Sequence, residues 1–85
     1  MASPFLESIR SELRLRGFSI KTEKSYLYWI TYYIRFIGRK HPAEVETTEV
    51  TRFLTFLAVE RHVTAGTQKI ALNALAFLYR KILHK

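Results

Sequence analysis

Hydrophobic residues recur along the chain at intervals of three and four, in four separate segments. This interval is typical of amphipathic α-helices, because it places the apolar side chains on one face of the helix. The pattern predicts helices over residues 3–16, 20–38, 48–61 and 65–84, and strand-like alternation is weak. The sequence therefore predicts an all-α, compact four-helix fold that occupies the whole chain, 1–85, as one domain.

Residues that commonly begin or end helices stand at the ends of these patterns. Ser3 and Ser19 stand where an N-cap is needed, and Pro4 takes the first helical position, where proline is tolerated. Gly17 follows the first pattern, and glycine commonly ends a helix. The fourth pattern has no stop and is still running at Lys85, so we expect an N-terminal domain excised from a longer protein rather than fraying at a natural end.

The second predicted helix carries an aromatic run between Tyr26 and Phe36. At about 100° per residue, Tyr26, Trp29 and Tyr33 fall on its apolar side, and we expect them in the core. The opposite side is polar and basic, and it carries Lys21, Lys24, Ser25, Tyr28, Thr31, Tyr32, Arg35 and Arg39.

Tyr28 and Tyr32 allow two interpretations, since both fall within this basic side. A phenol in such a position is able to donate a hydrogen bond to a phosphate or to lie along the sugar backbone of a nucleic acid. Alternatively, each ring covers the aliphatic stems of Arg35 and Lys24 in solvent. The sequence favours neither interpretation.

The fourth predicted helix is apolar on nearly every side, so we expect it to be central in the fold and nearly surrounded by the other helices. Its one polar seam consists of residues that project within about 60° of one another, namely Lys69, Asn73, Arg80 and His84. Its first turn offers Thr64, Thr67 and Gln68 beside unpaired backbone N–H groups. That arrangement suits an anion, although ordinary capping residues would look the same.

The other two predicted helices are less distinctive. In the third helix Phe56 and Val59 lie off the apolar stripe, where a neighbouring helix or a second protein would cover them. In the first helix Arg10 and Arg14 lie outside the stripe, and we expect them on a plain solvated face.

The formal net charge of +7 favours a polyanionic partner, but it is also compatible with solubility alone. Basic residues dominate segments 8–43 and 61–85, and the acidic segment 44–60 lies between them. One side of the molecule is positive if the fold brings the two basic segments together. The chain contains no run of about 18 apolar residues and no N-terminal leader pattern, so we expect no membrane span and a cytoplasmic location.

No catalytic site can be assembled from these residues. The chain has no cysteine and no aspartate, and its histidines, His41, His62 and His84, lack the helical spacing of metal ligands. A tyrosine nucleophile needs activating cations and a general base, and no tyrosine here is flanked by the required histidine. We therefore expect no metal, no cofactor and no enzymatic activity from this chain by itself.

Several motifs, in this order and spacing, resemble the N-terminal core-binding domain of tyrosine recombinases, and most of all that of integron integrases. They are Lys21–Thr22 ahead of Tyr26, the run Trp29–Ile30–x–x–Tyr33–Ile34, Thr67–Gln68, and the segment from Ala71 to Tyr79. The resemblance covers residues 5–83. It implies a SAM-like domain that forms one half of a C-shaped clamp on the recombination site. A separate catalytic domain, absent from this chain, would supply the arginines, the histidines and the tyrosine nucleophile.

The resemblance also implies where DNA binds. In the family the second and fourth helices face the DNA, and here these helices carry the basic side and the polar seam. Carried onto this chain, the resemblance implies contacts from Lys21, Thr22, Lys24, Tyr28, Thr67, Gln68, Lys69 and Asn73. The basic side and the seam add Ser25, Arg35, Arg39 and Arg80 as DNA-binding candidates.

We therefore expect the DNA-binding domain of a bacterial, integron integrase-like recombinase. Its partners would be DNA attachment sites and other protomers of the recombinase. The alternative is a helical protein-interaction module with a merely solubilising basic face, in which Phe56 and Val59 belong to the working surface. A membrane-binding amphipathic helix does not fit, because the helix with the basic side is expected to bury its aromatic residues in a core.

Overall fold

The computed structural model describes residues 3–84. Its α-helices are α1 (Pro4–Leu15), α2 (Ile20–Phe36), α3 (Thr48–Val59) and α4 (Ala65–Phe77). A 3-10 turn, Pro42–Glu44, precedes α3, and a π-helical turn, Leu78–Ile82, continues α4. Within residues 3–84 there is no strand, and the prediction of an all-α, four-helix fold is confirmed.

Hydroxyl caps begin three of the helices. The side-chain oxygens of Ser3, Ser19 and Thr64 each accept a hydrogen bond from the backbone N–H three residues later, at 3.1–3.3 Å. Such caps satisfy N–H groups that have no partner within the helix. The positions inferred for the starts of α1, α2 and α4 are therefore those that the structure uses.

The end of α2 differs slightly from the prediction. The helix ends at Phe36 rather than at residue 38. Gly38 and Arg39 both adopt positive φ values, of 80° and 64°, which an α-helix cannot accommodate. The Arg39 N–H then donates to the Ile34 carbonyl at 2.9 Å and satisfies a carbonyl at the helix end.

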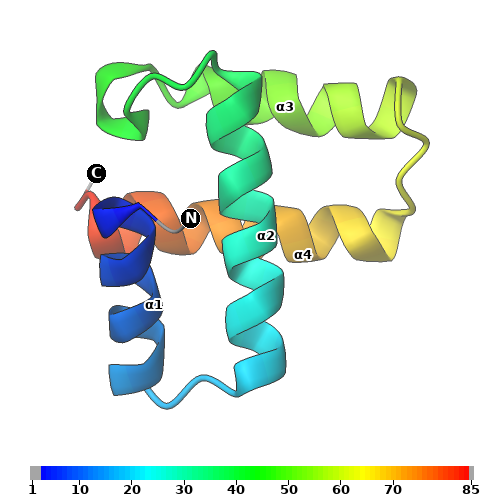
Figure 1. Cartoon of the computed structure of the whole chain (residues 1–85). Coiled ribbons are helices and arrows are strands. Elements are labelled where there is room, and N and C mark those ends of the chain that lie inside the picture. The colour runs from blue at the N-terminus through cyan, green and yellow to red at the C-terminus, as the bar shows by residue number, and fades with distance from the viewer. Residues whose placement is uncertain (1–2, 85) are drawn as a thin grey trace.

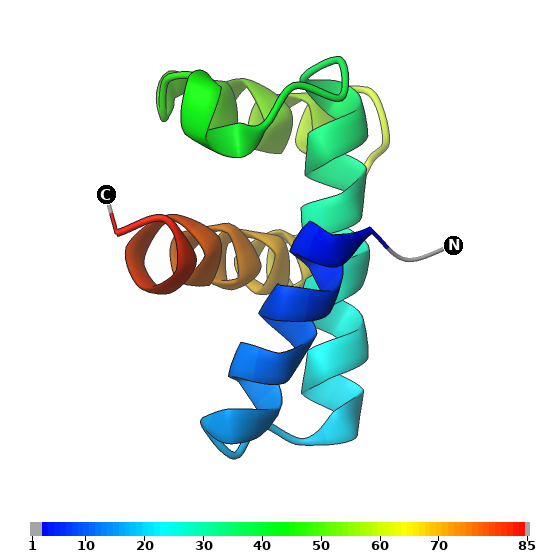
Figure 2. The ribbon, with the colours of Figure 1, turned by 60° about the vertical axis from the view of Figure 1, so that its left-hand side comes forward.

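The four helices form two crossed pairs. Figure 1 shows α1 and α2 side by side and antiparallel, with α3 and α4 running across them, and the turned view in Figure 2 agrees. The N-terminal half of α4 extends to one side of α2, and the π-helical turn lies on the other side. The crossing of α2 and α4 is therefore the centre of the molecule.

The core fills this crossing. The predicted core residues Trp29 and Tyr33 are buried, and Tyr26 is half-buried against Phe18 and Phe77. The remaining members of the core come from all four helices, the residue after α2 and the π-helical turn: Ile9, Leu13, Ile30, Ile37, Phe53, Leu57, Ala71, Ala74, Leu75, Phe77, Leu78 and Tyr79.

One expectation about α4 is wrong in part. The helix is central, but it is not surrounded, since Ile70 is 42% exposed and Leu72 is 46% exposed. The physical reason is the crossed arrangement, in which the N-terminal half of α4 extends to one side of α2 (Figure 1).

A hydrogen-bonded pair of tyrosines ties the crossing to the turn before α3. The hydroxyl oxygens of Tyr33 and Tyr79 lie 2.7 Å apart, and the Tyr79 hydroxyl donates to the Pro42 carbonyl at 3.1 Å. Because Tyr79 has a single proton, Tyr33 is the donor within the pair. Burial raises the pKa of both phenols, which keeps them neutral.

Candidate nucleic-acid interface

Where α1 packs against α2, the basic residues of α1 pair with a buried carboxylate of α2. Glu23 is 1% exposed, and Arg14 donates to its two carboxylate oxygens at 2.7 and 3.3 Å. Arg10 lies 3.6 Å from the same carboxylate. The hydrogen bond from Arg14 holds the pKa of Glu23 below its usual range, so the carboxylate is charged at neutral pH.

This pairing corrects the expectation of a plain solvated face on α1. Arg10 and Arg14 reach across to α2, and their partner was not visible in the pattern of either helix alone. Arg16, at the end of α1, pairs with Glu12 at 2.9 Å. All three arginines of residues 10–16 therefore have a carboxylate partner.

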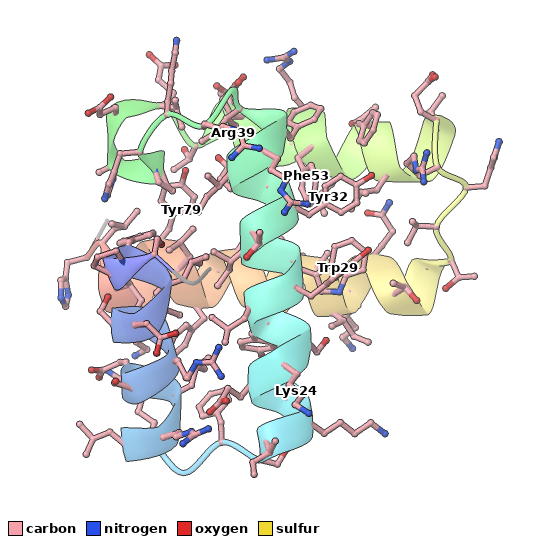
Figure 3. The ribbon with its side chains drawn as sticks, in the orientation of Figure 1. Lys24, Trp29, Tyr32, Arg39, Phe53 and Tyr79 are labelled. Carbon is pink, nitrogen blue, oxygen red and sulfur yellow. The ribbon has the colours of Figure 1, made fainter. Side chains whose placement is uncertain are left out.

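The basic residues of α2 and of the turn after it are in the opposite situation. Within residues 3–84 none of them forms an ion pair, and all are exposed: Lys21, Lys24, Arg35, Arg39 and Lys40. Lys24 and Arg39 lie toward opposite ends of the helix in Figure 3. The positive charge predicted for the outer side of α2 is thus available to an external partner.

At its N-terminal end, α2 shares a groove with α4. Lys21, Thr22 and Ser25 from α2 and Asn73 from α4 line a cavity of about 300 Å³, together with Tyr26 and Ile70. We call it the α2–α4 groove. It brings four DNA-binding candidates from two helices onto one surface, as the prediction of a common face requires.

Farther along the outer side of α2 lies a second groove, of about 510 Å³. Tyr28 and Arg35 line it, together with Leu27, Thr31, Tyr32 and Arg61, and we call it the tyrosine groove. Arg61 comes from the turn between α3 and α4 and was not among the candidates. Helical periodicity does not apply in a turn, so it could not predict which way Arg61 faces. The only signal in the sequence was its positive charge, directly after the acidic segment.

The structure distinguishes the two tyrosines on the outer side of α2. Tyr28 is 60% exposed. Tyr32 is half-buried in an aromatic cluster, parallel to Trp29 at 6.0 Å and edge-on to Phe53 at 5.3 Å between ring centroids (Figure 3). Tyr32 therefore belongs mainly to the packing between α2 and α3, and Tyr28 remains a candidate contact.

The candidates in the first turn of α4 are tied into the fold. Gln68 donates from its side-chain amide to the Leu54 carbonyl of α3 at 2.9 Å. The hydroxyls of Thr64 and Thr67 hydrogen-bond each other at 3.1 Å, next to the cap. These contacts support the capping interpretation of the turn, and Gln68 acts as a link between two helices.

The polar seam of α4 does not present a single edge. Asn73 borders the α2–α4 groove, whereas Arg80 borders a different one, with Thr47 and Thr51 toward α3. Lys69 is exposed and lines neither groove. Arg80 lies in the π-helical turn, where hydrogen bonds join residues five apart, so extrapolation at about 100° per residue fails there.

Another groove lies along α3 and the end of α2. Phe56 is half-buried and packs on Phe36 at 5.1 Å between ring centroids, whereas Val59 is 60% exposed. Both line a cavity of about 640 Å³ that Arg52 and Glu60 also border. We call it the α3 groove.

Residues 3–84 contain no group of acidic or histidine side chains that would hold a metal ion. None of their helices is long and apolar enough to cross a bilayer.

Known proteins resemble this chain over nearly its whole length. The family model described as phage integrase, N-terminal SAM-like domain, matches residues 5–85. An "Integrase/recombinase" of Escherichia coli and one of Pseudomonas aeruginosa are each 42% identical over 78 residues, covering 92% of this chain and 23% of the relative. A "Putative integrase/recombinase y4qK" of Sinorhizobium fredii is 25% identical over 83 residues, covering 98% of this chain and 27% of that relative.

The chain thus spans between 23% and 27% of the length of these relatives. The family match includes α2, α4 and the turn with Arg61, which together line the two grooves of α2. The chain therefore belongs to the family of phage integrase N-terminal SAM-like domains.

Proposed function

We propose that this chain is the DNA-binding domain of a site-specific recombinase of the integron integrase type. It holds the recombination site through the outer side of α2 and the N-terminal half of α4. The catalytic residues would lie in a separate domain that closes on the opposite side of the DNA. The names of the relatives and the motifs along α2 and α4 support this proposal.

One observation carries the proposal: the unequal pairing of cations. The arginines of α1 have carboxylate partners, whereas Lys21, Lys24 and Arg35 on α2 have none among the described residues. Unpaired cations along a helix, bordered by hydroxyl and amide groups, suit a phosphate backbone.

Most of the affinity would come from neutralised phosphates. If about five to seven phosphates are contacted, the slope of log K against log salt is roughly −4.5 to −6.3. Nonspecific affinity at physiological salt would then lie on the order of 10⁻⁴–10⁻⁶ M. Asn73, in the α2–α4 groove, is the residue best suited to read a base edge, since an amide matches the donor and acceptor of adenine.

Mapping of backbone amide shifts on adding a short duplex tests the proposal. We expect the largest shifts on α2 and the N-terminal half of α4. Shifts confined to α3 would contradict it. The double variant Lys24→Glu and Arg39→Glu should abolish binding without unfolding, because both side chains are exposed. Unchanged affinity in that variant would count equally against the proposal.

The α3 groove supports a second candidate function, a contact with another protein, such as a second protomer of a recombination complex. Val59 is exposed beside Phe56 and Phe36, and an aliphatic side chain in this setting suits an apolar partner. The two functions are compatible, because the α3 groove is lined by α3 residues, Glu60 and Phe36 and shares no residue with the α2–α4 groove or the tyrosine groove.

A further inference from the structure

The α2–α4 groove contains an exposed aliphatic side chain among polar ones. Ile70, on the N-terminal half of α4, is 42% exposed and lines this groove. It belongs neither to the buried core nor to the partly buried side chains that pack against the core. Its polar neighbours in the groove carry an ammonium group, two hydroxyls and an amide: Lys21, Thr22, Ser25 and Asn73. An apolar contact point thus lies within a surface that is otherwise suited to phosphates and base edges.

Exposure alone does not distinguish Ile70, because single exposed apolar residues are common on protein surfaces. Leu72, two residues later on α4, is 46% exposed and is likewise outside the core. Leu72, however, lines a different groove, with Val50 of α3. What sets Ile70 apart is its place beside Lys21, on the surface that we propose binds DNA.

The charge at the α2–α4 groove favours DNA over a protein segment as its occupant. Lys21 lines the groove, and Lys24 follows it by three residues on α2. Both are exposed, and neither has a carboxylate partner within residues 3–84. No acidic side chain of these residues lines the groove. The complementary ligand is therefore a polyanion that also offers an apolar group to Ile70.

We propose that Ile70 contacts the C5-methyl group of a thymine in the major groove of bound DNA and gives the domain a preference for thymine. The inference rests on the proposed DNA binding and adds to it a determinant of sequence preference. The major groove is wide enough for an α-helix, and the thymine methyl is the apolar group that its base edges present. The isoleucine side chain is entirely aliphatic, so it gains from burying a methyl group and forms no hydrogen bond with the other base edges.

The spacing of Ile70 and Asn73 supports this contact. Residues three apart lie on one face of an α-helix, with about 5–6 Å between their Cβ atoms. Successive base pairs are about 3.4 Å apart along a duplex, so the two side chains face base pairs about one or two steps apart. Asn73 is the residue that we propose reads adenine, and it lines the same groove. The two contacts together would favour a short run of A·T pairs.

The test removes the methyl group from the DNA and the aliphatic side chain from the protein. One short duplex alternates adenine and thymine, the other alternates adenine and uracil, and both have their ends closed by non-nucleotide linkers. The two duplexes carry the same phosphates and the same hydrogen-bonding groups, and they differ in the C5-methyl groups. Because every register of an alternating sequence presents the same base pairs, no particular target sequence is required. Dissociation constants are measured for the wild-type chain, Ile70→Ala and Leu72→Ala.

We expect the wild-type chain to bind the thymine duplex about fourfold more tightly than the uracil duplex, the effect of burying one methyl group. Ile70→Ala should bind the two duplexes equally, with the affinity that wild type has for the uracil duplex. Leu72→Ala is the matched control, since it removes a similarly exposed side chain from the same helix, and it should keep the preference. Circular dichroism should show both variants folded, because both residues lie outside the core.

A second measurement locates the contact on the protein. The methyl resonances of Ile70 should shift more when the thymine duplex is added than when the uracil duplex is added. Those of Leu72 should respond alike to the two duplexes, because its side chain lines the groove toward α3.

Three results overturn the inference. Equal affinity of the wild-type chain for the two duplexes leaves DNA binding intact and removes the role of Ile70. A thymine preference that survives Ile70→Ala, or that is lost in Leu72→Ala, places the methyl contact elsewhere. An equal loss of affinity for both duplexes in Ile70→Ala attributes its effect to something other than the methyl group. If the wild-type chain binds neither duplex, the proposed function fails together with this inference.

Discussion

The two faces of α2 carry the same kinds of side chain in different surroundings. On the inner face, Glu23 is paired with Arg14, and the Tyr33 hydroxyl is hydrogen-bonded to Tyr79. On the outer face, Lys21 has no carboxylate partner among residues 3–84, and Tyr28 is largely exposed. Charged and phenolic groups thus stabilise the fold on the inner face and are available to an external partner on the outer face.

Residue type alone therefore does not separate structural from functional positions. What separates them is whether the polar groups already have partners within the chain. The net charge of +7 includes Arg10 and Arg14, yet both form ion pairs with Glu23. Arg35 contributes the same formal charge and has no carboxylate partner among residues 3–84, which makes it a better indicator of a binding surface.

The largest difference in stability is expected between alanine substitutions at two tyrosines of α2. Tyr33→Ala should lower the free energy of unfolding by about 3–5 kcal/mol, because the ring is fully buried at the crossing with α4. Tyr28→Ala should change it by less than about 0.5 kcal/mol. Urea unfolding followed by circular dichroism measures both. Similar losses of unfolding free energy in the two variants would contradict the distinction between a structural inner face and an exposed outer face of α2.

Removal of single hydroxyl groups should give a smaller contrast. Tyr79→Phe leaves the Tyr33 hydroxyl without a partner and removes one of the two hydrogen bonds to the Pro42 carbonyl, which also accepts from the Val45 N–H at 3.4 Å. It should cost about 1–3 kcal/mol. Tyr28→Phe should be nearly neutral. The same urea experiment checks this pair, and a neutral Tyr79→Phe would show that the hydrogen bonds to Pro42 and Tyr33 contribute little.

The pairing of Glu23 should appear as a pH dependence of stability. Its pKa is lowered in the folded state, so its contribution is present above the usual glutamate pKa, about 4.3, and is lost as the pH falls through the folded value. We expect the free energy of unfolding of wild type to exceed that of Glu23→Gln near neutral pH, and the difference to disappear in acid. The effect should be modest, because Arg14 is 60% exposed and water screens the pair. A constant difference from pH 6 to about 2.5 would contradict the pairing.

Much of the fold followed from local rules. Ser3 and Ser19 cap helices as the sequence predicts, and the angular positions of Trp29 and Tyr33 place both rings in the core. These features depend on neighbours in the same helix, which a single sequence displays.

The parts of the site that escaped prediction depend on other elements. The partners of Glu23 come from α1, and the groove beside Tyr28 is completed by Arg61 from a turn. Arg80 departs from the expected seam because it lies in a π-helical turn. No periodicity within one helix reports contacts of this kind.

The most direct test compares two double variants with the same change in net charge. Lys21→Gln with Lys24→Gln removes unpaired cations, whereas Arg16→Gln with Arg52→Gln removes cations that are paired with Glu12 and Glu49. All four side chains are exposed, so stability should change little in either variant.

The measurement is the slope of log K against log salt for a paired duplex. We predict that the slope becomes shallower by about 1.8 in the lysine variant, roughly 0.9 for each lost phosphate contact, and stays unchanged in the arginine variant. Equal changes in both variants, or no change in either, would contradict the claim that the unpaired cations of α2 bind the DNA.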